Sequence, residues 1–233
     1  MKQTHILYSI ISLLIGASTV AQTTETTAVK TVGKVKPLRI GIDAFSLSRN
    51  VWDKNYKGID VSADYLYKKD HYAVVEAGFV DKYTREDRMD FSTMGSYLRL
   101  GIDKNLHQNW QGISNMIFVG GRYGFSLFKQ KLISYDLTTI GGIFEEEKVI
   151  VNRTYNDLQA HWLELVLGTK VEVLSGLYLG FNFRTHLLLY NSKLEQFENL
   201  YMPGYGKKYS GSVGASFNYT ISYSLPMKKK IKF

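Results

Sequence analysis

Charged residues that could do chemistry recur at alternate positions along much of this 233-residue chain. Both signs are mixed, and in each segment the charges share a face opposite to an apolar one. Buried charges persist in a fold only when they are paired and hydrogen-bonded. We therefore expect a network of salt bridges that fills the interior of the protein. The residues expected in it are Arg39, Asp43, Asp60, Asp64, Glu76, Arg99, Asp103, Arg122, Glu164, Lys170, Glu172 and Arg184.

The sequence contains no motif that points to catalysis or to a bound metal or cofactor. His71, His107, His161 and His186 lack the HExxH spacing of zinc sites, and no GxSxG elbow occurs. The acidic run 145–147 lacks the Asp/Asn spacing and turn glycine of a calcium loop. We therefore assign no catalytic, cofactor-binding or metal residue. If the protein modifies lipids instead, His161 or His186 beside a loop serine are the candidates.

The elements that must position these charges show a period of two, which is typical of strands rather than helices. In the last such segment, Val213 to Leu225 alternate with serines, Gly214, Asn218 and Thr220. The predicted strands are rich in β-branched and aromatic residues. They cover residues 38–47, 58–67, 71–80, 96–103, 115–125, 160–173, 177–184 and 212–225.

The lengths of these strands and of their connections favour a barrel. Most strands approach the 9–11 residues that a tilted membrane-spanning strand needs. Connections at one rim are predicted to be long and those at the other short, as in outer-membrane barrels. The long ones are 48–57, 81–95, 126–159 and 185–211, and the short ones are 68–70, 104–114 and 174–176. The sequence thus predicts an all-β fold, an eight-stranded antiparallel up-and-down β-barrel over residues 38–225.

The two ends of the chain are predicted to lie outside this barrel. Residues 1–21 combine Lys2, a short apolar run and small residues before the cut, and indicate a signal peptide. Residues 22–37 form a Thr- and Lys-rich flexible leader, and 226–233 a basic tail. The chain has no cysteine, so it can form neither a disulfide nor a cysteine-linked lipid anchor.

Glycines on the polar faces support the same fold. The narrow interior of an eight-stranded barrel needs small residues beside its polar side chains. Such glycines are Gly41, Gly58, Gly78, Gly101, Gly120, Gly168, Gly180 and Gly214. With its stretches 120–126 (GGRYGFS), 162–168 (WLELVLG) and 216–223 (SFNYTISY), the chain resembles the small eight-stranded outer-membrane barrels of Gram-negative bacteria. It is most similar to an uncharacterised family of such exported proteins.

We expect a non-enzymatic outer-membrane barrel that contacts outer-membrane lipid and presents external loops. A glycan or protein ligand is expected at loops 126–159 and 185–211. No nucleic-acid partner is expected, although the net charge is +8, because exported proteins rarely meet nucleic acid. The alternative is a soluble periplasmic lipocalin-like barrel, whose apolar residues point inward and bind a small apolar ligand. Alternation alone does not choose between the two.

Overall fold

The structure is a computed structural model that describes residues 38–86, 88–107, 115–137, 147–194, 199–208 and 211–225. The predicted signal peptide, leader and basic tail lie outside these described residues. Within the described ranges, no helix is both long enough and apolar enough to cross a membrane.

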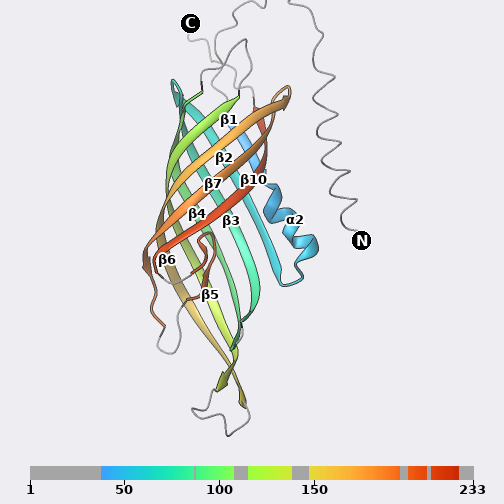
Figure 1. Cartoon of the computed structure of the whole chain (residues 1–233), viewed down its shortest axis with the longest axis vertical. Coiled ribbons are helices and arrows are strands. Elements are labelled where there is room, and N and C mark those ends of the chain that lie inside the picture. The colour runs from blue at the N-terminus through green and yellow to red at the C-terminus, as the bar shows by residue number, and fades with distance from the viewer. Residues whose placement is uncertain are drawn as a thin grey trace, which may run out of the picture. The chain divides into compact units, whose positions relative to one another are not determined.

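Eight strands form one closed antiparallel barrel, which confirms the predicted fold class (Figure 1). Around the barrel the order is β1-β10-β7-β6-β5-β4-β3-β2, so the first and last strands close the ring. A helix, α2, follows β1, and a separate two-stranded sheet of β8 and β9 follows β7. The bounds are β1 (Leu38–Asp43), α2 (Ala44–Trp52), β2 (Tyr56–Lys68), β3 (His71–Glu86), β4 (Met89–Asn105), β5 (Met116–Leu137), β6 (Glu147–Leu174), β7 (Leu177–Asn191), β8 (Tyr201–Met202), β9 (Gly206–Lys207) and β10 (Val213–Leu225).

The two faces of the barrel wall differ in polarity because successive side chains of a strand point to opposite sides. Apolar side chains are exposed on the outer face, as at Leu100 and Leu167, which are 46% and 56% exposed. The predicted inward charges are buried, except Glu172, which is half-buried. The Oε1 atom of Glu172 accepts a hydrogen bond from the N–H of Gly176 (2.8 Å) in the β6–β7 turn.

Inward glycines make room for large side chains in the interior, as predicted. A Cβ atom added at Gly124 would lie 2.1 Å from Cε2 of Trp162, and one at Gly78 would lie 2.3 Å from the ring of Tyr97. Both distances are far below van der Waals contact. These rings can therefore lie across the neighbouring strand only because it has no side chain there.

The long connections predicted at 81–95 and 126–159 are wrong in one respect, because most of their residues continue the strands. β3 extends to Glu86 and β4 begins at Met89, so the connection predicted at 81–95 is mostly ladder. β5 and β6 run together through most of 126–159 and protrude beyond the other strands at this end (Figure 1). The short turns at the opposite end are confirmed at 69–70 and 175–176.

The predicted first strand is wrong beyond Asp43, where the chain turns into α2. The side chain of Asp43 caps this helix, since its Oδ1 accepts hydrogen bonds from the N–H groups of Phe45 (2.9 Å) and Ser46 (3.3 Å). β1 pairs with β2 only as far as Val61 and with β10 only as far as Thr220. Beyond these points α2 lies against β2 and β10 and takes the place of the missing strand (Figure 1).

Candidate functional site

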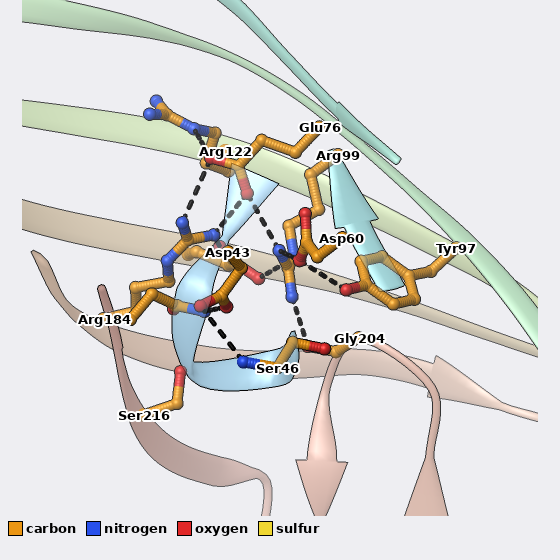
Figure 2. A network of polar contacts seen from close by, with 12 residues as sticks. Asp43, Ser46, Asp60, Glu76, Tyr97, Arg99, Arg122, Arg184, Gly204 and Ser216 are labelled. Carbon is orange, nitrogen blue, oxygen red and sulfur yellow. Dashed lines mark hydrogen bonds and ion pairs between the residues drawn. The ribbon is translucent and has the colours of Figure 1, made fainter. Parts of the chain in front are cut away.

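The centre of the barrel holds a cluster of carboxylates and guanidinium groups from facing strands (Figure 2). Glu76 of β3 forms ion pairs with Arg99 (2.8 Å), Arg184 (2.6 Å) and Arg122 (3.5 Å). Glu164 of β6 forms ion pairs with Arg99 (3.0 Å) and Arg184 (3.3 Å). Each arginine therefore contacts more than one acceptor, which is the condition under which buried charges are tolerated. The predicted interior network is confirmed, except that Asp43 and Glu172 form no ion pair among the described residues and instead accept hydrogen bonds from backbone N–H groups.

Further pairs extend the cluster along the barrel axis. Arg122 also meets Asp103 (2.6 Å), and Asp64 accepts hydrogen bonds from Arg39 Nε (2.6 Å) and from Lys170 Nζ. Asp60 accepts a hydrogen bond from the Tyr97 hydroxyl and pairs with Arg99 (3.3 Å). The members come from β1, β2, β3, β4, β5, β6 and β7, so the network ties most of the wall together.

The network leaves little space in the interior. The buried cations of the lumen are Arg39, Arg99, Arg122, Lys170 and Arg184, and its buried carboxylates are Asp43, Asp60, Asp64, Glu76, Asp103 and Glu164. A cavity of about 20 Å³ among these side chains is large enough for about one water molecule. The lumen is thus filled by its own polar side chains over the described residues.

One end of the lumen is covered by the hairpin of β8 and β9. Met202 is fully buried there, and the Gly204 carbonyl accepts a hydrogen bond from Arg99 Nη2 (2.9 Å) (Figure 2). The Tyr205 ring packs against Trp162, with ring centroids 6.1 Å apart, and its hydroxyl donates to the carbonyl of Ser212 (3.2 Å). This part of the predicted loop 185–211 therefore closes the mouth of the barrel instead of extending away from it.

The side chain of Asn50 seals the wall where α2 replaces a strand. Its Nδ2 donates to the Gly58 carbonyl (2.8 Å), and its Oδ1 accepts from the Gly58 N–H (2.7 Å). One amide side chain thus supplies the two hydrogen bonds that a neighbouring strand would have given β2. The Phe45 ring packs on Phe217 of β10, with centroids 5.3 Å apart. Helix α2 is therefore joined to both strands that it separates.

A serine, a histidine and a glutamate form a hydrogen-bonded chain below the covered mouth. His186 Nε2 lies 2.8 Å from Ser216 Oγ, and His186 Nδ1 lies 3.2 Å from Glu164 Oε1. Glu164 Oε1 also accepts a hydrogen bond from Trp162 Nε1 (2.6 Å). His186 and Glu164 are buried, whereas Ser216, near the start of β10, is half-buried. Serine, imidazole and carboxylate in this order are the groups of a nucleophilic serine.

The histidines singled out in the sequence take different positions. His161 lies in an aromatic cluster, where its Nδ1 lies 2.6 Å from the Tyr123 hydroxyl and its ring is 4.8 Å from Phe125. His186, predicted just beyond a strand end, lies within β7 and faces inward. Its serine partner comes from β10 and not from a loop. Ser216 was missed, and the only signal for it was its place on the polar face of a strand.

Beyond the barrel mouth, the extended strands carry an ion pair of their own. Lys148 Nζ donates to Asp90 Oδ2 (2.8 Å), and the Ser134 hydroxyl donates to the same oxygen (3.2 Å). The hydrogen bond from Lys148 lowers the pKa of Asp90 below its ordinary value, and the same contact raises the pKa of Lys148. This carboxylate therefore favours the extended β4–β6 structure when it is ionised.

Two solved structures resemble this fold distantly. The attachment invasion locus protein Ail of Yersinia pestis is 12% identical, with a TM-score of 0.39 over 82% of this chain and 97% of that one. Neisserial surface protein A (NspA) is 10% identical, with a TM-score of 0.38 over 83% of this chain and 98% of that one. No curated protein matches the sequence. The family model described as "Domain of unknown function (DUF6048)" matches residues 2–230, and the chain belongs to this family.

Proposed function

We propose that the protein is an outer-membrane barrel with a filled lumen that presents its extended β5–β6 hairpin for an interaction outside the cell. The observation that carries this proposal is the polarity of the wall. Apolar side chains such as Leu100, Leu165 and Leu167 face outward and are exposed, while the charges face inward. A water-soluble barrel has the opposite arrangement, because exposed apolar area is unfavourable in water.

The height of the apolar surface fits a bilayer. On β7, outward-facing apolar residues begin at Leu179 and end at Leu189, ten residue-to-residue steps farther along the strand. At a rise of about 3.4 Å per residue and a tilt of about 45°, they span roughly 24 Å along the barrel axis. Outer-membrane barrels carry an apolar band of about 25 Å. The His161 cluster with Tyr123 and Phe125 suits the aromatic girdle that borders such a band.

The lipocalin-like alternative conflicts with the interior. It requires an apolar cavity for its ligand, whereas the described lumen is lined by Asp60, Glu76, Arg122 and Arg184 and leaves only about 20 Å³. The same filling speaks against a channel. The remaining role is that of an anchor whose activity lies at its exposed end.

The β5–β6 hairpin is the better of the two expected interaction loops. Its strands continue well beyond the apolar band, so they project from the membrane in this arrangement. The other expected loop, 185–211, folds over the barrel mouth in its described part, where Met202 is buried. A glycan or protein ligand is therefore proposed for the hairpin within 126–159.

The membrane proposal and the soluble alternative predict opposite effects of one substitution. In a bilayer, Leu167→Arg places a charge near the middle of the apolar band and costs about 2–4 kcal/mol. In a soluble barrel it removes exposed apolar surface and leaves stability unchanged or higher. We expect the variant to lose folding free energy in lipid vesicles, while Thr154→Arg on the projecting hairpin does not. Equal stability of both variants, together with release of the native protein from envelopes by carbonate, would refute the membrane proposal.

A further inference from the structure

The Ser216–His186–Glu164 chain has the connections that acyl transfer requires. His186 Nδ1 faces the Glu164 carboxylate (3.2 Å), so the tautomer that satisfies both contacts carries its proton on Nδ1. His186 Nε2 is then unprotonated and accepts the hydrogen bond of the Ser216 hydroxyl (2.8 Å). A serine with a base at this distance, which a carboxylate orients in turn, is an activated nucleophile.

We propose that Ser216, His186 and Glu164 form an esterase site at the mouth of the barrel. Ser216 Oγ attacks the carbonyl carbon of an ester, and its proton passes to His186 Nε2. The tetrahedral intermediate collapses, the C–O bond to the alcohol breaks, and the alcohol leaves with that proton. Water then attacks the acyl group on Ser216 with the same base, which releases the acid and restores the serine.

The surrounding residues hold the Glu164 carboxylate of this site in place. Glu164 is anchored by Trp162 Nε1 (2.6 Å) and by ion pairs with Arg99 (3.0 Å) and Arg184 (3.3 Å). These contacts fix the carboxylate that orients His186. Arg184 also stands directly across from Ser216 in the β7–β10 ladder. Its guanidinium group contacts Glu76 (2.6 Å) and Glu164 (3.3 Å), so it holds the carboxylate of the site and not the serine.

The site lies near the covered end of the barrel. Ser216 is the fourth residue of β10 and is half-buried, like Asn218 and Thr220 on the same face, whereas Ser222 is buried. Next to it on the same face is Gly214, where an added Cβ would be in van der Waals contact with Tyr205 Oη (3.4 Å) and His186 Cδ2 (3.7 Å). An ester approaching the serine would pass beside Tyr205.

The residues around Ser216 limit the class of ester that the site can bind. The cavity of about 20 Å³ deeper in the lumen is lined by Arg184 and Asn218 but not by Ser216 or His186, so it forms no channel for a long acyl chain that leads inward from the serine. An acyl group that enters the lumen must therefore be short, such as acetyl, and the alcohol must remain at the mouth. We infer that the substrate is a short O-acyl ester of a polar alcohol, such as a sugar hydroxyl, presented outside the barrel.

The test uses the full chain refolded in detergent micelles, with folding checked by the shift in electrophoretic mobility on heating. The probes are a fluorophosphonate reporter and 4-nitrophenyl acetate. We expect labelling and acetate release by the wild type and by Ser222→Ala, a control on the same face of β10. Ser216→Ala and His186→Asn should lower both by about 10³-fold or more. No labelling of the folded wild type, or equal labelling of Ser216→Ala, would overturn the proposal.

A second variant separates catalysis from a purely structural hydrogen bond. The chain lacks cysteine, so Ser216→Cys introduces a single thiol. A thiol beside a base reacts faster because more of it is thiolate. We expect iodoacetamide to alkylate Ser216→Cys several-fold faster than the double variant that also carries His186→Asn. Equal rates would show that His186 does not activate this position. Faster turnover of 4-nitrophenyl palmitate than of the acetate would refute the short-acyl substrate class.

Discussion

Removal of the Glu76 carboxylate is the most direct test of the filled lumen. In the Glu76→Ala variant, Arg122 keeps its ion pair with Asp103 (2.6 Å), and Arg99 keeps its ion pair with Glu164 (3.0 Å). Arg184 is affected most, because its contacts to Glu76 at 2.6 and 3.1 Å are lost and its remaining ion pair is 3.3 Å long. Breaking a buried pair in this way costs about 3–5 kcal/mol, since a buried charge is left uncompensated.

The measurement is the free energy of unfolding in urea, in micelles, followed by tryptophan fluorescence. Glu86→Ala is the matched control, because Glu86 pairs with Lys207 at 2.8 Å but is partly exposed, and such pairs are worth about 1 kcal/mol or less. Adding Arg184→Met to Glu76→Ala should recover part of the loss, because the unpaired charge is gone. If Glu76→Ala loses no more unfolding free energy than Glu86→Ala does, the network is not a source of stability.

Three further predictions concern other parts of the barrel. Asn50→Ala leaves a backbone N–H and C=O of β2 unpaired and should cost about 1–3 kcal/mol in the same unfolding assay; no loss would contradict the sealing role. Gly124→Ala forces a Cβ against the Trp162 ring and should cost about 1–3 kcal/mol, with partial recovery when Trp162→Phe is added. Because Lys148 lowers the pKa of Asp90 in the folded state, their contribution is present above the ordinary carboxyl pKa and disappears as the pH falls through the folded value. Amide protection of the projecting strands should therefore fall below about pH 4, and Lys148→Ala should weaken that dependence, while Ser134 and Arg85 still contact Asp90.

The number of strands and the face of each charge were predictable from the sequence because a strand exposes alternate residues to two different environments. The prediction stops where the polarity of the two faces changes. On the outer face of β5, Lys129 and Lys131 follow the apolar Leu127, while Phe128 and Leu132 are buried on the inner face, so the pattern of apolar outside and polar inside is lost. Backbone pairing continues there, because ladder hydrogen bonds do not depend on side-chain polarity. The predicted strands are therefore shorter at this end than the observed ones.

Helix α2 was missed for a related reason. Asp43 is a favourable capping residue, but the alternation from Leu38 runs past it to Ala44 and masks it. The contact between Ser216 and His186 could not be predicted from the sequence at all. The contact depends on the register of β7 and β10, in which Ser216 faces Arg184 and Gly214 faces His186. About twenty residues connect these strands, and nothing in their composition sets that register.

The network and the proposed site are one structural unit, because Glu164 belongs to both. Its Oε1 accepts a hydrogen bond from Trp162 and contacts His186. The two arginines that hold the carboxylate, Arg99 and Arg184, also form ion pairs with Glu76. A displacement of Glu164 would leave Arg99 and Arg184 short of acceptors, which is unfavourable in a buried site. The ion-paired side chains that fill the lumen therefore also hold the imidazole of His186 in place next to Ser216. Loosening the network at Glu76 should reduce reactivity at Ser216 even though Glu76 does not contact it, whereas a site independent of the network would keep its full reactivity in every variant that still folds.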